Sequence, residues 1–564
     1  MLREKKWDVK TGRPQGSPLR IEEILSLLLE NRNIGDEDRE LFLVPDLDVI
    51  TPEFVGIDTG MLAKAIDRIK TAIEKKEQII VFGDYDVDGI TGAAILWETL
   101  HGMGANVLPY IPHRVEEGYG LSIKGIENLK GIPDQVRDDK AEVSLIITVD
   151  NGIVANEAVA FANKQGIDVL ITDHHVRGDM LPEAYAVVHT TKLCGAGVAY
   201  LLSQELKSQN SKLKSEQGDY LDLVALGTVA DLVPLTGANR ILVAHGLKAL
   251  QETKRAGLLE LFDEAGIEKE TIGVYEIGHV IAPRLNAMGR LLSAMDSLRL
   301  VCTKDRMRAK VLADKLGRTN RERQLLTMSM TKHAIEKVVS RQSSVANIIV
   351  LEDESYEEGI IGLIAGRIVE EFYRPAIVIS RREEISKASA RSVKGFNIIE
   401  SIRTTTDLLV NAGGHPMAAG FSIKTENISL FIRAIENHAN GVITDAMLTR
   451  VLTIDCELPV QHVTKNIYDA IQQLAPFGMG NSEPVFVSYS VPVRDIRAIG
   501  AEGKHLKMKL GTPIMIDAIA FGFGEMISKI NPGDMIDIAY TIDENTWNGR
   551  TTLQMKIRDI RRGE

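Results

Sequence analysis

The stretch that decides the fold is IIVFGDYDVDGITGAAILWETL, residues 79–100. An apolar run ends at Gly83, an acidic segment follows it, and a helical pattern begins after Gly89. Short buried strands that alternate with helices are typical of βαβ units around a mostly parallel sheet. We therefore expect an α/β domain over residues 56–250. Further apolar runs that fit this alternation lie at 106–111, 145–150, 169–173 and 186–189.

The remaining chain divides by pattern into four segments. Residues 1–55 are mixed, with a leucine-rich helix candidate, and 344–445 read as a second, smaller α/β unit. Residues 251–343 form a helical connector, in which 304–341 predict one long helix or a pair of helices. Eleven Lys or Arg residues against four Asp or Glu give 304–341 a local charge of +7. This connector is either a solvated helix or a surface that contacts phosphates.

The last segment, residues 446–564, has an all-β pattern. Five or six strand candidates in about 110 residues fit an OB-type barrel, with a small sandwich as the alternative. Asn548-Gly549 predicts a hairpin turn between the last two strands.

Composition limits the class of protein. The chain of 564 residues is 44% hydrophobic and 26% charged, as in soluble globular proteins. A net charge of −12 argues against a surface that is basic throughout, but it leaves room for a local basic groove. Three widely spaced cysteines indicate neither a disulfide framework nor a cysteine zinc site. Without a signal-like start or a membrane-length apolar run, we expect a cytoplasmic protein with no membrane contact.

Acidic residues follow directly on several predicted strands. In an open parallel sheet, ligands bind beyond the carboxyl ends of the strands, so these side chains should converge on one crevice. Any one of them could simply cap the next helix. Together, clustered carboxylates either raise each other's pKa or recruit cations, and carboxylates with imidazoles suit Mn²⁺ or Mg²⁺. Two such ions would activate a water and clamp a phosphoryl group, which points to phosphoester hydrolysis. The acids in question are Asp84, Asp86, Asp88, Asp150 and Asp173, the last preceding His174 and His175.

Four motifs in order carry a resemblance to a known family. GDYDVDG (83–89), VDNG (149–152), TDHH (172–175) and GTVADLVPL (227–235) resemble the signature motifs of the DHH phosphoesterase superfamily. Within that superfamily, four further segments are similar to the bacterial RecJ family of single-strand-specific exonucleases. These segments are IPHRVEEGYGLS (111–122), APRLNAMGR (282–290), SARSVKGFNI (389–398) and NAGGHPMAAG (411–420).

The resemblance implies a fold and a metal centre. The expected fold is a parallel-sheet DHH domain joined by a long helix to a smaller α/β DHH-associated domain, with a C-terminal OB-type barrel. The expected activity is 5′→3′ resection of single-stranded DNA with two Mn²⁺ or Mg²⁺ ions, in DNA repair and recombination. Asp150 would bridge the ions, His175 would lie beside the scissile phosphate, and Asp173 would orient a histidine. The implied metal ligands are Asp84, Asp86, Asp88, Asp150, His174 and Asp231.

The same resemblance implies substrate contacts and partners. Asn286 and Arg290 match catalytic positions near the reacting phosphate, and His415 matches a substrate-binding position in a glycine-rich run. Arg114, Ser389 and Arg391 match positions that hold the 5′-terminal phosphate, which suits a guanidinium because it binds phosphate bidentately. The expected partners are single-stranded DNA, single-strand-binding protein and a RecQ-type helicase, and we expect a monomer.

The chain departs from the family pattern at three places, and two rival functions remain. Glu357 stands where the family commonly has a histidine, residues 131–144 look like an insertion, and the link between AVVHTT (186–191) and GAGVAY (195–200) looks shortened. One rival is a DHH enzyme that acts on small phosphate substrates, such as short oligonucleotides, cyclic dinucleotides or pyrophosphate. The β module and the 389–398 segment argue against it. The other rival is a non-catalytic DNA-binding relative, against which the intact acidic motifs argue.

Overall fold

The structure, a computed structural model, describes residues 5–10, 20–114, 116–130, 142–209, 219–340, 346–547 and 549–563. Most of the predicted insertion (131–141) and Asn548 of the predicted turn lie outside the described residues. The chain forms two compact units, one of Pro45–Leu448 and one that joins Met1–Val44 to Thr449–Glu564. No helix among the described residues has both the length and the apolar character needed to cross a membrane.

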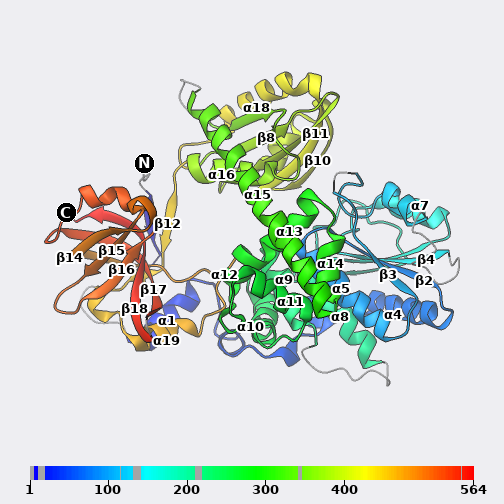
Figure 1. The fold of residues 1–564 in the computed structure, drawn as a ribbon, viewed down its shortest axis with the longest axis horizontal. Helices are drawn as coiled ribbons and strands as arrows, with labels where there is room; N and C mark the ends of the chain where they lie inside the picture. Colours follow the sequence, from blue (N-terminus) through cyan, green and yellow to red (C-terminus); the bar gives the residue numbers. More distant parts are fainter. Residues whose placement is uncertain are drawn as a thin grey trace. The chain divides into compact units, whose positions relative to one another are not determined.

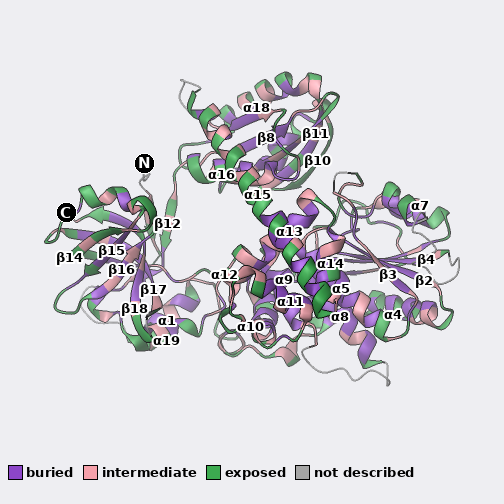
Figure 2. Ribbon diagram, in the orientation of Figure 1, coloured by how far each residue is buried: buried purple, intermediate pink, exposed green. Residues whose placement is uncertain are grey.

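A five-stranded, fully parallel sheet with the order β3-β2-β4-β5-β6 lies at the start of the Pro45–Leu448 unit (Figure 1). The continuous apolar runs explain the burial, because a parallel sheet has helices on both faces. Every residue of β2 is buried (Figure 2). The predicted strands are therefore confirmed. Their bounds are β2 Gln78–Gly83, β3 Val107–Tyr110, β4 Val143–Val149, β5 Asp168–Asp173 and β6 Ala186–His189.

Alternate side chains of these strands enter two different cores. In β2, Ile79 and Val81 pack with the helices on one face. Ile80 and Phe82 pack with the helices on the other face. The first face is covered by α4 (Thr59–Glu74), α5 (Val87–Gly102) and α8 (Gly195–Ser208), the second by α6 (Ile123–Lys130) and α7 (Asn156–Lys164). The result is a three-layer α/β domain whose strands all end at one edge.

A helical region follows and ends in one long helix. α15 (Arg306–Ser340) is a single helix of 35 residues rather than a pair. Its first half packs on the core of the first sheet through Leu312 and Leu316, and its second half packs near the second sheet through Ala334 and Val338. The preceding helices are α9 Leu221–Ala230, α10 Gly237–Gln251, α11 Ala256–Ala265, α12 Val274–Glu276, the π-helical turn η3 Ile277–Ile281, α13 Ala282–Leu291 and α14 Met295–Cys302.

The second sheet of this unit is mixed, with the order β10-β11-β9-β8-β7. β7 and β8 are parallel and are connected by α16. Each neighbouring pair in the order β8, β9, β11 and β10 is antiparallel. The bounds are β7 Ile349–Asp353, α16 Ile361–Phe372, β8 Ala376–Ser380, β9 Ile385–Arg391, α17 Ile398–Arg403, β10 Leu409–His415, β11 Ala418–Lys424 and α18 Ile428–Val442. This is the second α/β unit that the sequence predicts.

The other unit contains a closed barrel. β14 pairs with both β15 and β17, which closes the order β14-β15-β16-β18-β17 into a five-stranded barrel and excludes the sandwich. The N-terminal residues belong to this unit, since β1 (Lys6–Val9) pairs with β12 (Val451–Ile454) and α1 (Ile21–Glu30) joins its core. The other elements are α2 Arg39–Leu43, β13 Cys456–Glu457, α19 Lys465–Gln472, β14 Phe486–Ile499, β15 His505–Leu510, β16 Ile516–Ala520, β17 Met535–Trp547 and β18 Arg550–Arg562.

Candidate active site

The loop after β2 delivers three carboxylates to the edge of the first sheet. Asp84 is 1% exposed, and neither of its carboxylate oxygens accepts a hydrogen bond from the residues that the structure describes. Asp86 caps α5, because its Oδ1 accepts hydrogen bonds from the backbone N–H groups of Asp88 and Gly89 at 3.0 and 3.1 Å. Asp88 accepts from the first turn of α8 instead. Helix capping therefore accounts for Asp86, but it does not account for the buried carboxylate of Asp84.

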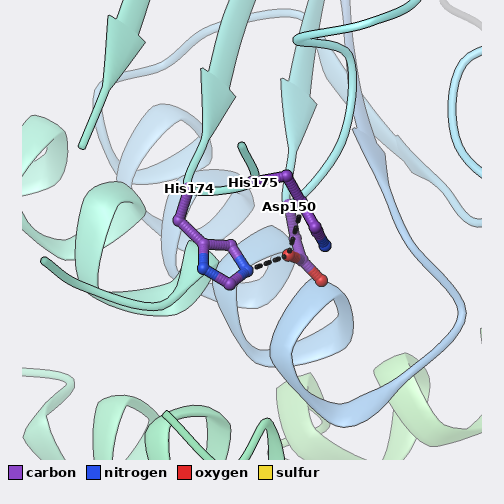
Figure 3. A group of neighbouring side chains, drawn as sticks. All are labelled: Asp150, His174 and His175. Carbon is purple, nitrogen blue, oxygen red and sulfur yellow. Dashed lines mark ion pairs between the residues drawn. The ribbon is translucent and has the colours of Figure 1, made fainter. Parts of the chain in front are cut away.

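Asp150, His174 and Asp231 converge on the same place from three further elements. His174 Nε2 lies 3.0 Å from Asp150 Oδ1 (Figure 3), 3.5 Å from Asp231 Oδ2 and 3.7 Å from Asp88 Oδ2. Asp150 follows β4, His174 follows β5, and Asp231 ends α9. The convergence that the strand ends predict is thus present in the structure.

The donor atoms form three groups, and in each group they lie within 4.8 Å of one another. One group is Asp84, Asp86 and Asp150, a second is Asp88, His174 and Asp231, and a third is Asp150, His174 and His175. Asp150 belongs to the first group, and its Oδ1 also lies 3.0 Å from Nε2 of His174 in the second group. The six residues that the resemblance implies as ligands all lie in the first two groups.

The electrostatics of this cluster call for cations. Burial, and then the neighbouring carboxylates, raise the pKa of Asp84, Asp86 and Asp150, and the pKa of Asp231 rises to about 9 for the same reasons. Burial lowers the pKa of His174, which favours the neutral imidazole that ligates metals. Asp150 Oδ1 and His174 Nε2 are buried and face each other at 3.0 Å, and among the described residues neither makes a hydrogen bond to another group. Oxygen-rich donors with one imidazole fit Mn²⁺ or Mg²⁺, so these residues are suited to hold two such ions.

His175 has a different environment from His174. Its Nδ1 lies 2.8 Å from Asp173 Oδ1, and Asp173 also accepts from the backbone N–H groups of His174 and His175. Its Nε2 lies 3.2 Å from the Tyr119 hydroxyl, and its ring stacks on His415 with centroids 6.3 Å apart. Burial alone would lower the pKa of His175, but the hydrogen bond and charge of Asp173 raise it. Asp173 thus holds the ring of His175 through Nδ1.

Asn286 and Arg290 both lie on α13, but they contact protein groups. Asn286 Oδ1 accepts from the N–H of Val87 at 3.0 Å, which fixes the start of α5 next to the acidic loop. Arg290 donates to the carbonyl oxygen of Gly359 at 3.2 Å. Burial, and then the guanidinium groups of Arg114, Arg323 and Arg391, lower the pKa of Arg290 to about 9. The catalytic roles expected for Asn286 and Arg290 stay predictions.

A polar cavity of about 220 Å³ lies between the loops of the first sheet and the second sheet. Arg114 and Tyr119 line it from one side, and Ser389 and Lys387 of β9 line it from the other. Arg391 donates to Ser389 Oγ at 3.3 Å, and no described carboxylate lies within ion-pair distance of Arg114 or Arg391. The residues that the resemblance assigns to a terminal phosphate therefore do lie together.

The position of the missing family histidine lies at the margin of this cavity. Glu357 is 57% exposed in its side chain and lies 3.8 Å from Arg382, whereas its neighbour Glu358 lines the cavity and pairs with Lys387 at 3.1 Å. Glu357 does not enter the cluster of acids around His174.

Tyr119 is a functional candidate that the sequence reasoning did not select. Its hydroxyl donates to the carbonyl oxygen of Asp150 at 3.2 Å and also lies against His175, and its ring packs edge-on against Tyr85. Arg114 in turn lies over the Tyr85 ring at 4.9 Å. The motif GYG at 118–120 could have indicated Tyr119, because it lies in the same family-like segment as Arg114.

Comparison with known proteins fits this geometry. Three family descriptions match the sequence: "DHH family, N-terminal domain" over residues 78–228, "DHHA1 domain" over 345–441 and "RecJ OB domain" over 454–559. The single-stranded-DNA-specific exonuclease RecJ of Bacillus subtilis is 36% identical over 550 residues, which cover 95% of this chain and 67% of the relative. The chain belongs to the RecJ family.

Other members of the RecJ family agree. RecJ of Thermus thermophilus is 32% identical over 526 residues, with 92% of this chain and 73% of the relative covered. The crystal structure of RecJ from Thermus thermophilus in complex with Mn²⁺ matches with a TM-score of 0.82 and 29% identity, over 99% of this chain and 80% of that one. The same protein in complex with Mg²⁺ matches with a TM-score of 0.77.

Proposed function

We propose that this chain is a metal-dependent exonuclease that hydrolyses single-stranded DNA from the 5′ end and acts in DNA repair and recombination. The observation that carries the proposal is the neighbourhood of two complementary sites in one unit. Buried carboxylates, among them Asp84 with two oxygens that accept no hydrogen bond from the described residues, lie beside a cavity lined by Arg114 and Ser389, and Arg391 donates to Ser389 Oγ. A phosphodiester held with divalent ions would satisfy both.

Two Mn²⁺ or Mg²⁺ ions would be held by the six ligand candidates, one by Asp84, Asp86 and Asp150 and the other by Asp88, His174 and Asp231. When bound, such ions supply an activated water and neutralise charge on the phosphoryl group. Asp150 would serve both sites, since its Oδ1 lies 3.0 Å from His174 Nε2. Asp173 holds the Nδ1 of His175, so that its Nε2 faces Tyr119 and the cavity side of the cluster.

The cavity would bind the 5′-terminal phosphate. Arg114, Ser389 and Arg391 offer donors, and the carboxylate of Glu358, which also lines the cavity, pairs with Lys387. A planar guanidinium can hold phosphate with two hydrogen bonds. Arg290 adds positive charge beside Arg114 and Arg391. Asn286 would act by holding the start of α5, and His415 by its contact with His175.

The remaining predictions belong to the same proposal. We propose a cytoplasmic monomer whose domains are 56–250, 344–445 and 446–564, joined by the connector 251–343 and preceded by 1–55. Single-stranded DNA is the proposed ligand of the barrel and the basic connector, and single-strand-binding protein and a RecQ-type helicase are proposed partners.

The decisive experiment digests single strands labelled at one end. The purified protein is incubated with 5′- or 3′-labelled oligonucleotides, with duplex of the same sequence and with dinucleotides, each with Mn²⁺, Mg²⁺ or EDTA. We expect mononucleotide release from the 5′ end of the single strand with either metal, and none with EDTA. Preferential turnover of dinucleotides would favour a small-substrate phosphodiesterase, and metal-independent binding without cleavage would favour a non-catalytic relative.

A further inference from the structure

Gly195, the first residue of α8, lies between two of the metal-binding carboxylates. Its backbone N–H donates to Asp88 Oδ2 at 2.6 Å, and the N–H of Ala196 donates to Asp88 Oδ1 at 2.8 Å. Both oxygens of Asp88 are therefore held by the first turn of one helix. Since the first N–H groups of a helix have no partner inside the helix, they are available for this contact.

The Cα of Gly195 meets Asp150 on its other side. A methyl group on Gly195 would lie 2.5 Å from the Cβ of Asp150 and 2.9 Å from its Cα, far inside van der Waals contact. Asp150 has little room to retreat, because its own N–H donates to the carbonyl oxygen of Thr172 at 3.0 Å. Its φ of 64° lies in the left-handed region, which a residue with a side chain occupies only where its surroundings hold it.

Gly227 of α9 closes the space behind Asp88. A methyl group there would lie 2.6 Å from Asp88 Oδ1 and 2.7 Å from the Cβ of Ala196. Asp88 is thus enclosed by the start of α8 on one side and by the backbone of α9 on the other. Neither glycine has a positive φ, so close approach rather than a special turn explains why glycine stands at both positions.

Asp88 and Asp150 belong to the two different donor groups, and both face His174 Nε2, at 3.7 and 3.0 Å. The residue that separates these two carboxylates therefore sets the separation of the two groups. We propose that Gly195, supported by Gly227, is a positioning residue that fixes the spacing of Asp88 and Asp150 and so permits two ions to bind together. The inference rests on the proposed two-metal function, and it goes beyond the ligands themselves.

The test is Gly195→Ala, measured by Mn²⁺ binding to the full chain. Isothermal titration gives the number and affinity of the ions, and electron paramagnetic resonance shows whether two Mn²⁺ ions are close enough to couple. Residues behind metal ligands typically change affinity by about 10–100-fold. We expect Gly195→Ala to weaken Mn²⁺ binding by about that factor and to abolish the coupled signal, because Asp150 serves both groups.

Two glycines provide matched controls. Gly246→Ala places a methyl 2.5 Å from the carbonyl oxygen of Leu221, as close as the clash at Gly195 but at the end of α9 away from Asp231. Gly366→Ala lies in α16 with nothing within 4 Å. Both should bind two Mn²⁺ ions with wild-type affinity, even if Gly246→Ala melts at a lower temperature. A loss of Mn²⁺ binding in Gly246→Ala equal to that in Gly195→Ala would overturn the inference, since general strain would explain both.

Gly227→Ala decides the matter if Gly195→Ala does not fold. Its methyl meets the end of the Asp88 side chain rather than Asp150, so we expect one Mn²⁺ ion to bind normally and the second to bind at least about tenfold more weakly. Two ions bound at wild-type affinity in Gly195→Ala, or in Gly227→Ala where only that variant folds, would overturn the positioning role. If the wild-type protein itself bound no Mn²⁺ and digested no single strands, the proposed function would fail instead.

Discussion

The two sheets of the Pro45–Leu448 unit present opposite charges to their shared surroundings. The parallel sheet ends in buried acids, and neither oxygen of Asp84 accepts a hydrogen bond within the described part of the chain. The mixed sheet offers Arg391, whose guanidinium donates only to Ser389 Oγ and to the carbonyl oxygen of Ala390 among the described residues. The acidic side therefore has an excess of negative charge, and the side with Arg391 has an excess of positive charge.

The difference lies in what would complete each side. Buried carboxylates with raised pKa values need cations, whereas unpaired guanidinium groups need an anion. A phosphodiester with divalent ions supplies both at once. The comparison therefore makes separable predictions: damage to the acidic side should abolish the chemistry, and damage to the basic side should change which ends are accepted.

Asp150→Ala should have the largest effect. The variant removes a carboxylate that belongs to one donor group and lies 3.0 Å from His174 of the other. Metal ions contribute several kcal/mol to such reactions, so we expect a loss on the order of a thousandfold in rate with Mn²⁺. The assay is release of nucleotides from a 5′-phosphorylated single strand. Asp67→Ala, at an exposed position on α4, is the control and should keep the wild-type rate. A wild-type rate in Asp150→Ala would remove the bridging assignment.

Arg391→Ala should have the next largest effect, and of another kind. Hydrogen bonds to charged groups contribute about 1.5–3 kcal/mol, so KM for a 5′-phosphorylated strand should rise about 10–100-fold. The kcat should change much less, and a strand with a 5′-hydroxyl should be almost unaffected. Arg367→Ala, an exposed arginine that pairs with Glu370, is the control. An unchanged preference for the phosphate would disprove the docking role of Arg391.

The carboxylates of the acidic side could be predicted from the sequence better than the backbone contacts that hold them in place. Continuous apolar runs followed by an acid mark the end of a buried parallel strand, so the positions of Asp84, Asp150 and Asp173 followed from local pattern. The ligand set itself came from ordered motifs. By contrast, nothing in the sequence around Gly195 reveals that Asp150 lies against it, because the contact joins distant segments and Gly195 contributes only backbone atoms.

The basic side and the barrel show the same limit. The grouping of Arg114 with Arg391 followed from motif resemblance, since the two lie 277 residues apart and no periodicity connects them. The pairing of β1 with β12 was not predicted, because one short strand carries no information about its partner. The partner of Asn286, the N–H of Val87, is also a product of the folded chain alone.

Tyr119→Phe tests a tyrosine that lines the cavity and also contacts the acidic cluster. The variant keeps the ring against Tyr85 but removes the hydroxyl that lies 3.2 Å from both the Asp150 carbonyl oxygen and His175 Nε2. One such hydrogen bond contributes about 0.5–1.5 kcal/mol, so kcat should fall about 2–10-fold. Tyr185→Phe, on an exposed tyrosine outside the site, should match the wild type. If both variants keep full activity, Tyr119 acts through its ring and not through its hydroxyl.

Glu357→His should have the smallest effect and should sharpen the charge comparison. Glu357 is exposed and only 3.8 Å from Arg382, so breaking this pair should change the free energy of unfolding by less than about 1 kcal/mol. Removing one negative charge near a polyanion should strengthen the binding of single-stranded DNA about two- to threefold at low salt, and the gain should vanish at high salt because exposed charges are screened. Fluorescence anisotropy with a labelled oligonucleotide measures the affinity at low and at high salt, with EDTA present to prevent digestion. Glu383→His, an exposed glutamate in the turn before β9, is the matched control. An equal gain in both variants would show that only the net charge matters, whereas a gain confined to position 357 would place that side chain beside the bound strand.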